Sequence, residues 1–391
     1  MIKKIPYGRQ FIDKNDKLSV ISSLSNDLIT TGPYVKKFEK NSAKFLKTKY
    51  SLSCSSGTSA LKLSFCAAQL KKNDVVIMPV INFIAAYNMA STFGANIYLA
   101  DVDKNTGQMT PETLLECIKK FKLKKIKIIL TMYMGGFPEN VFEFYKIKKK
   151  YKCILIEDAC HAFGAKYYVK NKAYKVGSCN HSDIAIFSFH PLKPITTGEG
   201  GLLSTNKKNF YDIAKIFRSH GIIRNNKNHW DYDIKNLGYN YRLSDINCAL
   251  GISQLKKIKI FLNKRKKIYI YYKSQLNGFK NILSFPKYNK HNSPAYHLVI
   301  INIKFRELNS KDKFIYYLLK NRIIAQFHYK PINNFSIYKK KNIKFPNSMV
   351  YYNSSISIPI YHSISKKELK HIIQTIKNYV IKNNNLFANN H

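Results

Sequence analysis

Short apolar runs alternate with longer segments of mixed polarity between residues 50 and 205. The runs have the length and the near-continuous apolar character of strands that are buried on both faces. They are "DVVIMPV" (74–80), "ANIYLADVD" (95–103), "KIKIILTMY" (125–133), "KCILIEDA" (152–159) and "DIAIFSF" (183–189). In the helix-like segment 59–70, Leu61, Phe65 and Ala68 share one face. The pattern predicts an α/β fold with a mainly parallel sheet covered on both sides, and "GLLST" (201–205) as a further edge strand.

The pattern changes after residue 258. A Lys-rich helix is predicted over 261–276, and predicted strands over 295–303 and 323–329 flank another helix. This order is typical of a smaller α+β domain. The chain therefore divides into three predicted parts: a large domain with an N-terminal arm over 1–255, a small C-terminal domain over 256–385 and a frayed tail over 386–391.

The charge of the chain is extreme, because 66 Lys and Arg residues against 22 Asp and Glu residues give a formal net charge of +44. A field of that sign attracts polyanions, including phosphorylated small molecules. Lysine is enriched along the whole chain, however, and neither a single basic stripe nor a nucleic-acid-binding motif stands out. We therefore expect no nucleic-acid partner and interpret the charge as a bias of composition.

The 7 cysteines are scattered without a C-x-x-C pair, which argues against a disulfide framework and a structural zinc site. No compact group of His, Asp and Glu residues suggests another metal. The N-terminus lacks an apolar signal core, and no apolar run reaches membrane-spanning length. The sequence thus predicts a cytoplasmic protein without a metal and without stable membrane insertion.

One lysine, Lys193, lies in a bend bounded by proline and glycine in "FSFHPLKPITTGEGGLLST" (187–205). The bend follows a predicted strand, and ligand sites of parallel sheets lie at the carboxyl ends of strands. A lysine in an apolar site or near another cation has a lowered pKa, which frees its amine for Schiff-base chemistry. The alternative is an ordinary exposed loop lysine.

Asp158 ends another predicted strand, directly after Glu157. Successive strand residues point to opposite faces, so only one of these acids can face the crevice at the strand ends. A carboxylate beside a pyridine nitrogen keeps that nitrogen protonated, which pyridoxal phosphate requires to act as an electron sink. Alternatively, Asp158 caps a following helix.

Gly57, Thr58 and Ser59 lie between a short strand and a helix in "SCSSGTSALKL". Backbone N–H groups at a helix N-terminus, with hydroxyl groups beside them, form a phosphate site. Alone, Gly-Thr-Ser is a common helix cap. Together with Lys193 and Asp158, it meets the needs of pyridoxal phosphate: a phosphate cradle, an acid for the ring nitrogen and an amine for the aldehyde.

Several long stretches resemble the DegT/DnrJ family of pyridoxal-phosphate-dependent aminotransferases, which act on nucleotide-linked keto-sugars. They run in order over nearly the whole chain: "CSSGTSAL", "IEDACHAFGA", "FSFHPLKPITTGEGG", "FRSHGI", "LGYNYRLSDINCALGISQLKK" and "AQFHYKPI". The resemblance implies the fold type I architecture of aspartate aminotransferase. The opening "IPYGRQ", together with "FSFHPLKPITTGEGG" and "AQFHYKPI", is also similar to the branch that aminates C4 of a UDP-linked 4-keto-6-deoxy-2-acetamido-L-sugar in pseudaminic acid synthesis.

Carried over by position, the resemblance implies that Lys193 binds the cofactor aldehyde and moves the proton, while Asp158 pairs with the pyridinium nitrogen. Phe83 would stack on the ring, and His161 would lie under it unless it is a hydrogen-bonded core histidine. Thr58, Ser59 and Ser188 would hold the phosphate. Asn240 would reach the phosphate of a partner subunit, so the resemblance also implies a homodimer with a shared active site.

The resemblance places Tyr7, His190 and His328 near the sugar or its diphosphate, with L-glutamate as the amino donor. Glu199, Arg218 and His220 stay open between a structural role and substrate contact. Phe137 stands where relatives often carry a polar residue, which leaves the acceptor open. The alternatives are another nucleotide 3- or 4-keto-sugar aminotransferase and, from a different class, a non-enzymatic regulator on the same fold.

Overall fold

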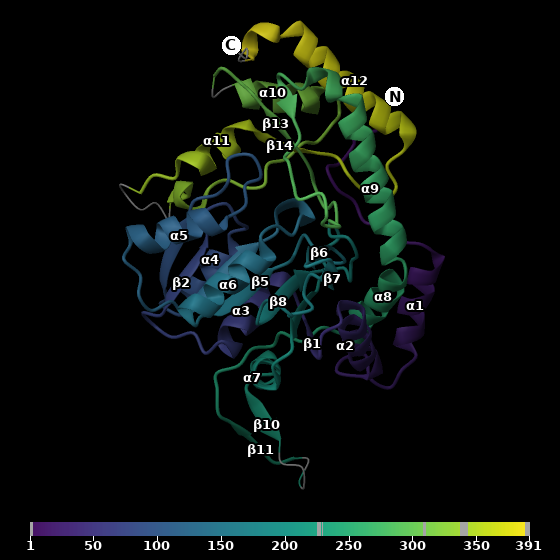
Figure 1. Ribbon diagram of the computed structural model, residues 1–391. Helices are drawn as coiled ribbons and strands as arrows, with labels where there is room; N and C mark the ends of the chain where they lie inside the picture. Colours follow the sequence, from purple (N-terminus) through teal and green to yellow (C-terminus); the bar gives the residue numbers. More distant parts are fainter. Residues whose placement is uncertain (1–2, 225–227, 229, 308–309, 337–342, 388–391) are drawn as a thin grey trace.

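The computed structural model describes residues 3–224, 228, 230–307, 310–336 and 343–387. A large body contains a seven-stranded sheet, and a smaller body above it contains a three-stranded sheet (Figure 1). The long helix α9 (Ile258–Gln275) runs along one side of the molecule from one body to the other (Figure 1). The predicted domain boundary at residue 255 falls near the end of helix α8 (Asp245–Lys256), and it stays a prediction.

The seven-stranded sheet contains every strand predicted between residues 74 and 205. In spatial order its strands are β1 (Tyr50–Cys54), β9 (Gly201–Thr205), β8 (Ile184–Ser188), β5 (Ile154–Asp158), β4 (Ile128–Met132), β2 (Val75–Pro79) and β3 (Asn96–Ala100). Neighbours from β8 to β3 pair in parallel, which confirms the mainly parallel sheet.

Strand β9 departs from the sequence prediction, because it lies inside the sheet rather than at its edge. It pairs antiparallel with β8 on one side and with β1 on the other. The chain returns from β8 to β9 through the bend 189–200, which contains no helix. A short connection of this kind reverses the chain, whereas a parallel pair needs a longer crossover.

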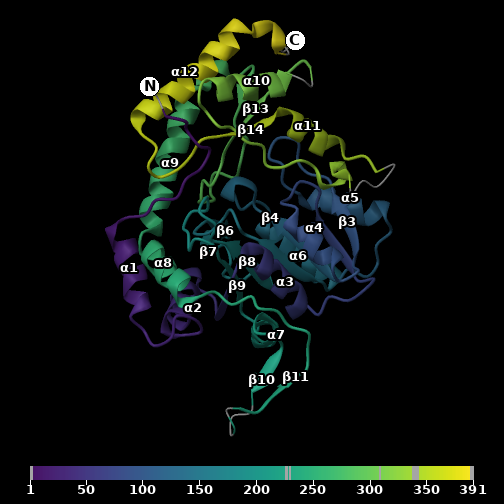
Figure 2. The same ribbon diagram turned by 180° about the vertical axis from the view of Figure 1, so that it is seen from behind.

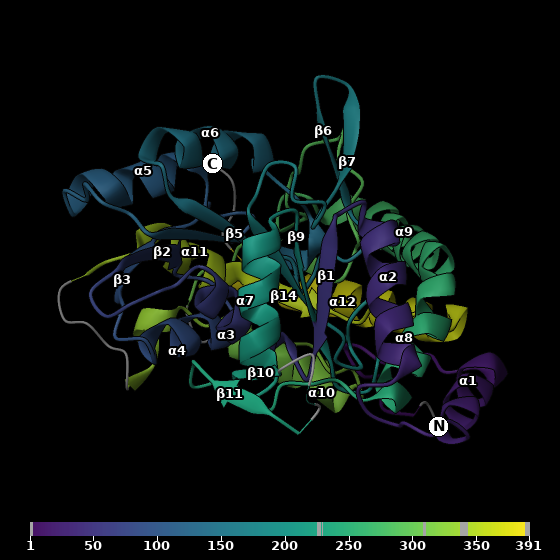
Figure 3. The ribbon, with the colours of Figure 1, turned by 90° about the horizontal axis from the view of Figure 1, so that it is seen from below.

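Helices cover both faces of this sheet (Figure 3). One face packs against α3 (Gly57–Ala67), α4 (Ala85–Ser91) and α7 (Lys208–Arg218). The other face packs against α2 (Pro33–Leu46), α5 (Pro111–Lys120), α6 (Val141–Tyr151) and α8, and α1 (Lys14–Leu24) lies on α8. Within β2, Val76 and Met78 belong to the first core and Ile77 to the opposite one. Burial on both faces explains why the parallel strands are almost continuously apolar.

The smaller body contains an antiparallel sheet with helices packed beside it (Figure 2), and α9 contributes Ile268, Tyr269 and Tyr272 to its core. Its strands are β12 (Leu283–Ser284), β13 (Val299–Ile303) and β14 (Ser355–Ile358), and its helices are α10 (Ser310–Lys320), α11 (Pro346–Ser354) and α12 (Lys366–Lys382). Its core also contains Ile5 from the N-terminal segment and Phe387. Residues 386 and 387 are therefore not frayed as predicted, and residues 388–391 lie outside the described residues.

The predicted strand over 323–329 is wrong. This segment makes only isolated bridges, from Ile323 to Ile5 and from Gln326 to Ser357. The apolar residue Ile323 packs into the small core, whereas His328 lines a cavity of the large body. The two ends of the segment thus make separate contacts, one with the small core and one with the cavity, instead of forming a continuous strand pairing.

Two hairpins stand out from the large body. Strands β6 (Lys166–Val169) and β7 (Lys172–Lys175) form one, and β10 (Ile222–Arg224) and β11 (Tyr232–Ile234) form an arm that projects away from the sheet (Figure 1). In the part of the chain that the structure describes, 3-10 turns lie at Met134–Gly136, Asn277–Phe279, Ile332–Asn334 and Asn384–Leu386. All of the cysteines are free thiols. Within the described residues, no helix has the length and apolar character that crossing a membrane requires.

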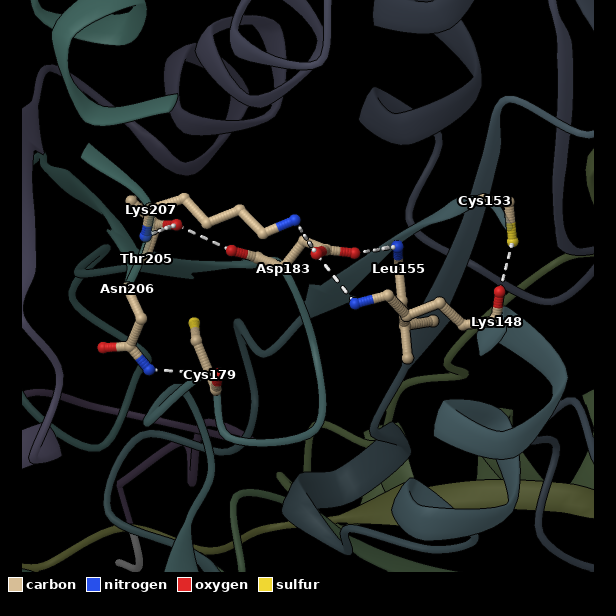
Figure 4. A network of polar contacts seen from close by, with 8 residues as sticks. All are labelled: Lys148, Cys153, Leu155, Cys179, Asp183, Thr205, Asn206 and Lys207. Atoms are coloured by element: carbon tan, nitrogen blue, oxygen red, sulfur yellow. Dashed lines mark hydrogen bonds and ion pairs between the residues drawn. The ribbon is translucent and has the colours of Figure 1, made fainter. Parts of the chain in front are cut away.

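Asp183 lies directly before β8 and fixes how β8 sits beside its neighbours (Figure 4). Its carboxylate accepts hydrogen bonds from Lys148 Nζ and from the Leu155 N–H, each at 2.8 Å, and Lys207 Nζ also lies 2.8 Å away. The Thr205 hydroxyl donates to the Asp183 carbonyl oxygen at 2.7 Å. One carboxylate, 1% exposed, therefore connects α6 and β5 to the start of β8.

We expect Asp183→Asn to lower the free energy of unfolding by about 3 kcal/mol, because it removes the negative charge that two lysines face in a buried site. Urea denaturation followed by circular dichroism measures the change. Asp212→Asn is the matched control, since Asp212 pairs with Lys208 at 2.6 Å on the exposed surface of α7. Exposed pairs contribute little to stability because solvent screens them, so equal effects of the two substitutions would contradict the role given to Asp183.

Candidate active site

A cavity of about 370 Å³ opens at the carboxyl ends of β5 and β8. Its wall also includes the first turn of α3 and residues 328–329. These two residues end the segment 323–329, which begins in the core of the small body with Ile323. The sequence-predicted site residues that line it are Tyr7, Gly57, Thr58, Phe83, Asp158, His161, Ser188, His190, Lys193 and His328. The fold therefore brings most of the predicted residues to one place.

Hydrogen bonds within the bend after β8 hold Lys193 at this cavity. The Phe189 N–H donates to the Gly200 carbonyl oxygen at 2.8 Å, and the Thr197 N–H donates back to the Phe189 carbonyl oxygen at 3.0 Å. Burial lowers the pKa of the Lys193 amine, and the neighbouring Cys160 and Asp158 oppose that shift. Lys193 is thus not the ordinary exposed loop lysine that the sequence left open.

Asp158 is the last residue of β5 and is 3% exposed. Residues 159–165 form turns rather than a helix, and Asp158 Oδ1 accepts the Cys160 N–H at 3.2 Å, so helix capping is not its role. Burial raises the pKa of Asp158, while the hydrogen bonds from Cys160 and the charge of Lys193 lower it. Glu157 instead accepts the Tyr133 hydroxyl at 2.9 Å and does not line the cavity. Of the two adjacent acids, only Asp158 faces Lys193.

The first turn of α3 presents Gly57 and Thr58 to the cavity. N–H groups in the first turn of a helix have no partner within the helix, so they are available to an anion. A Cβ built on Gly57 would lie 2.9 Å from Ser188 Cβ and 3.4 Å from Cys160 Sγ. Glycine is therefore the residue that keeps this corner of the cavity open.

Ser59 does not line the cavity, in contrast to its predicted role. Its hydroxyl lies 2.8 Å from Ser55 Oγ and 3.0 Å from Ser56 Oγ, and its N–H donates to Ser56 Oγ at 3.0 Å. The Ser59 side chain thus supports the helix cap, while Ser56, which the sequence analysis omitted, lines the cavity.

Buried imidazoles form another part of the cavity wall. His161 Nε2 lies 3.0 Å from the Tyr329 hydroxyl, and the His161 ring lies 4.3 Å from the His297 ring. His328 Nδ1 lies 2.9 Å from Ser357 Oγ. Burial, reinforced by the charge of Lys193, lowers the pKa of His161 and His297 well below the usual value and that of His328 to about 3. These rings are neutral near pH 7.

The sequence model of the DegT/DnrJ/EryC1/StrS aminotransferase family matches residues 10–377. The chain belongs to this family. It is 35% identical over 376 residues to the UDP-4-amino-4,6-dideoxy-N-acetyl-beta-L-altrosamine transaminase of Campylobacter jejuni, covering 95% of this chain and 96% of the relative. The predicted family membership is confirmed.

Two solved structures extend the comparison. Helicobacter pylori PseC, an aminotransferase involved in the biosynthesis of pseudoaminic acid, has a TM-score of 0.89 at 28% identity and covers 97% of this chain and 100% of its own. The PLP form of a putative sugar aminotransferase from Streptococcus pneumoniae has a TM-score of 0.88 at 25% identity and covers 97% of this chain and 99% of its own. The family's aminotransferases depend on pyridoxal phosphate, and the predicted fold type I architecture is confirmed.

Several predicted residues lie away from the cavity of this chain. Asn240 is exposed and bridges Ser219, so it does not complete the site of its own chain. Arg218 Nη1 pairs with Glu39 Oε1 at 2.6 Å and donates to the Ser53 carbonyl oxygen, which gives it a structural role. The His220 N–H donates to the Tyr239 carbonyl oxygen, and His220 does not line the cavity. Glu199 does line it.

Three residues that no sequence pattern indicated also line the cavity: Cys160, His297 and Tyr329. Cys160 and Tyr329 are adjacent in the chain to the predicted residues His161 and His328. Proximity to a predicted site residue was therefore the sequence signal that could have identified them. His297 stands at the polar start of the apolar run 298–303. Its presence at the site depends on the contact between the small body and the large one, which no local pattern records.

We expect His328→Gln to weaken the acid sensitivity of folding. The folded pKa of His328 is about 3, whereas an unfolded histidine titrates near 6.5. As the pH falls below about 6.5, the unfolded chain takes up a proton that the folded chain does not, so stability is lost. Between pH 6.5 and 4.5 the unmodified protein should lose about 2 kcal/mol more than the variant in urea denaturation. If the unmodified protein and His328→Gln lose equal stability over this pH range, His328 takes up a proton in the folded protein as well.

Proposed function

We propose that this protein uses pyridoxal phosphate to transfer an amino group from L-glutamate to C4 of a UDP-linked 4-keto-6-deoxy-2-acetamido-L-sugar. The observation that carries the proposal is the meeting of Lys193, Asp158 and the first turn of α3 at one cavity. The similarity to the Campylobacter jejuni transaminase along 95% of the chain supports the choice of acceptor. This reaction belongs to pseudaminic acid biosynthesis, for which the Helicobacter pylori neighbour is named.

The residues of the cavity fit the cofactor. The N–H groups of Gly57 and Thr58 and the Ser188 hydroxyl would hold the phosphate at the positive end of α3. Asp158 would hold a proton on the ring nitrogen, and Lys193 would bind the aldehyde. His161 Nδ1 is buried and has no hydrogen-bond partner among the described residues, so it is available to a polar group of a ligand.

Lys193 would serve as the group that carries the proton. When bound, pyridoxal phosphate would supply an aldehyde that condenses with amines and a ring that accepts the electrons of a breaking bond. Burial lowers the pKa of the Lys193 amine, which raises the fraction of the uncharged form that can accept a proton. Asp158, 3% exposed, would provide fixed negative charge where the dielectric is low.

The hydrogen bond between Tyr329 and His161 would fix the orientation of the His161 ring. Tyr329 Oη lies 3.0 Å from His161 Nε2, and both side chains line the cavity. Phe83 is 52% exposed and lies with its ring centroid 5.8 Å from that of Tyr329. Its exposed ring is available to stack on a bound heterocycle.

We further propose a homodimer whose active sites share Asn240 of the partner subunit. Exposed apolar side chains gather on and beside α1, where Leu18 is 51%, Ile21 60% and Leu24 55% exposed, and Leu237 is 89% exposed near the base of the β10–β11 arm. The three side chains on α1 follow each other at intervals of three residues and so share one face, and exposed apolar surface of this kind marks an interaction site. Asn240 is exposed and so remains accessible to a second subunit. The free thiols fit a reducing cytoplasm as the compartment.

The absorption spectrum of the protein reconstituted with pyridoxal phosphate tests the cofactor assignment. The unmodified protein should show the visible band of an aldehyde bound to a lysine, and L-glutamate should remove that band. Lys193→Ala should lack the band, because it removes the amine that binds the aldehyde. A band that persists in Lys193→Ala would show that another lysine binds the cofactor.

Gly57→Ala should weaken binding of pyridoxal phosphate about tenfold or more, because the added methyl group would press against Ser188 and Cys160 where the phosphate is expected. Titration of the apoprotein with the cofactor measures the dissociation constant. Gly278→Ala is the matched control, since a Cβ there meets nothing within 4 Å. Equal affinity in both variants would place the phosphate elsewhere.

The acceptor is tested by mass spectrometry after incubation with L-glutamate and nucleotide keto-sugars. The UDP-linked 4-keto-6-deoxy-2-acetamido-L-sugar should gain an amino group while 2-oxoglutarate appears in equal amount. Amination of a different 3- or 4-keto-sugar alone would retain the aminotransferase activity and reject the acceptor. No amination of any keto-sugar by the cofactor-loaded protein would favour a regulator.

A further inference from the structure

A second cavity of about 400 Å³ lies between the two bodies of the molecule. One wall is the turn 103–110, which follows β3, and the other wall is formed by residues 284–287 and Asn302 of the three-stranded sheet. It shares no described lining residue with the catalytic cavity. Its volume lies in the range of small-molecule sites.

Two buried amide groups in this cavity lack a hydrogen-bond partner among the described residues. Gln108 is 4% exposed and Asn302 9% exposed. The unpartnered atoms are Gln108 Nε2, a donor, and Asn302 Oδ1, an acceptor. Asn302 Nδ2 donates to the Asn105 carbonyl oxygen at 2.7 Å, which fixes the orientation of its amide. Buried polar atoms are rarely left unpaired, because each costs stability, so this pair points to a ligand.

The carboxylates of the cavity, in contrast, are already hydrogen bonded within the protein. Asp103 Oδ1 accepts the N–H groups of Asn105 at 3.1 Å and Thr106 at 2.8 Å. Glu139 Oε2 accepts the Asn289 N–H at 3.1 Å. The lining contains two carboxylates, Asp103 and Glu139, and one lysine, Lys287, so its local charge does not favour an anion. The buried atoms of the lining that lack a partner among the described residues belong to neutral amides.

We propose that this cavity binds an uncharged polyhydroxylated ring, such as a sugar unit, through Gln108 and Asn302. A hydroxyl group both donates and accepts hydrogen bonds, so adjacent hydroxyls of one ring satisfy both unpartnered atoms. Phe285 and Pro286 line the same cavity and provide apolar surface for the C–H groups of the ring. The site is separate from the transamination proposed above and does not depend on it.

Isothermal titration of the cofactor-loaded protein with D-glucose and with N-acetyl-D-glucosamine tests the proposal. At least one of these uncharged probes should bind saturably, and Gln108→Leu and Asn302→Leu should each weaken binding about tenfold or more by removing a hydrogen-bond partner. Gln374→Leu is the matched control, because Gln374 is exposed on α12, away from the cavity lining, and donates to Asn378 Oδ1 at 2.8 Å. The control should bind as the unmodified protein does.

Hydrogen exchange on the unmodified protein locates the probe even if the variants are unstable. Protection of residues 103–110 and 284–287 on probe binding supports the site. Protection confined to the catalytic bend 189–200 overturns it, and so does the absence of saturable binding, which would make the cavity a water-filled pocket. Binding of inorganic phosphate in preference to either sugar would equally overturn the assignment of a neutral ligand.

Discussion

The register between β5 and β8 is the constraint on which the catalytic cavity depends. Asp158 pairs opposite Ile186, and side chains alternate along a strand, so a slip by one residue would exchange Asp158 with Glu157 at the cavity. The other end of the same strand pair holds the register, because the Asp183 carboxylate accepts the Leu155 N–H and faces Lys148 and Lys207. The position of the cavity's carboxylate is thus set by a buried polar network at the opposite end of the β5–β8 strand pair.

The same cavity also requires both bodies of the molecule. Lys193, Asp158 and the α3 turn come from the large body, whereas His328 and Tyr329 follow the segment whose residue Ile323 packs in the small core. The Tyr351 hydroxyl of α11 donates to the His328 carbonyl oxygen at 2.8 Å. Tyr329 and His161 then join the two sides by a hydrogen bond of 3.0 Å. Local packing in the small body therefore determines the imidazole wall of a site that the large body begins.

The cavity depends on the local register of two strands and on contacts between the two bodies, and this difference explains which of its features the sequence could predict. Parallel strands buried on both faces leave a local apolar signature, and Lys193, Asp158 and Gly57 sit in motifs directly at the ends of such strands or at a helix start. By contrast, the interior position of β9, the loss of regular structure at 323–329 and the place of His297 result from contacts between distant segments. Ser59 shows that even a local motif leaves hydrogen-bond partners undetermined. The motif predicts a hydroxyl group at the helix start, but not that this hydroxyl contacts Ser55 and Ser56 instead of lining the cavity.

The turn after β3 connects the two cavities physically. Residues 103–110 line the second cavity, and Gly107 within them has φ +68° and lies so close to the Tyr351 ring that a Cβ would collide with it. Tyr351 in turn holds the His328 carbonyl oxygen at the catalytic cavity. The turn that lines the second cavity therefore packs against the residue that positions His328 at the catalytic cavity.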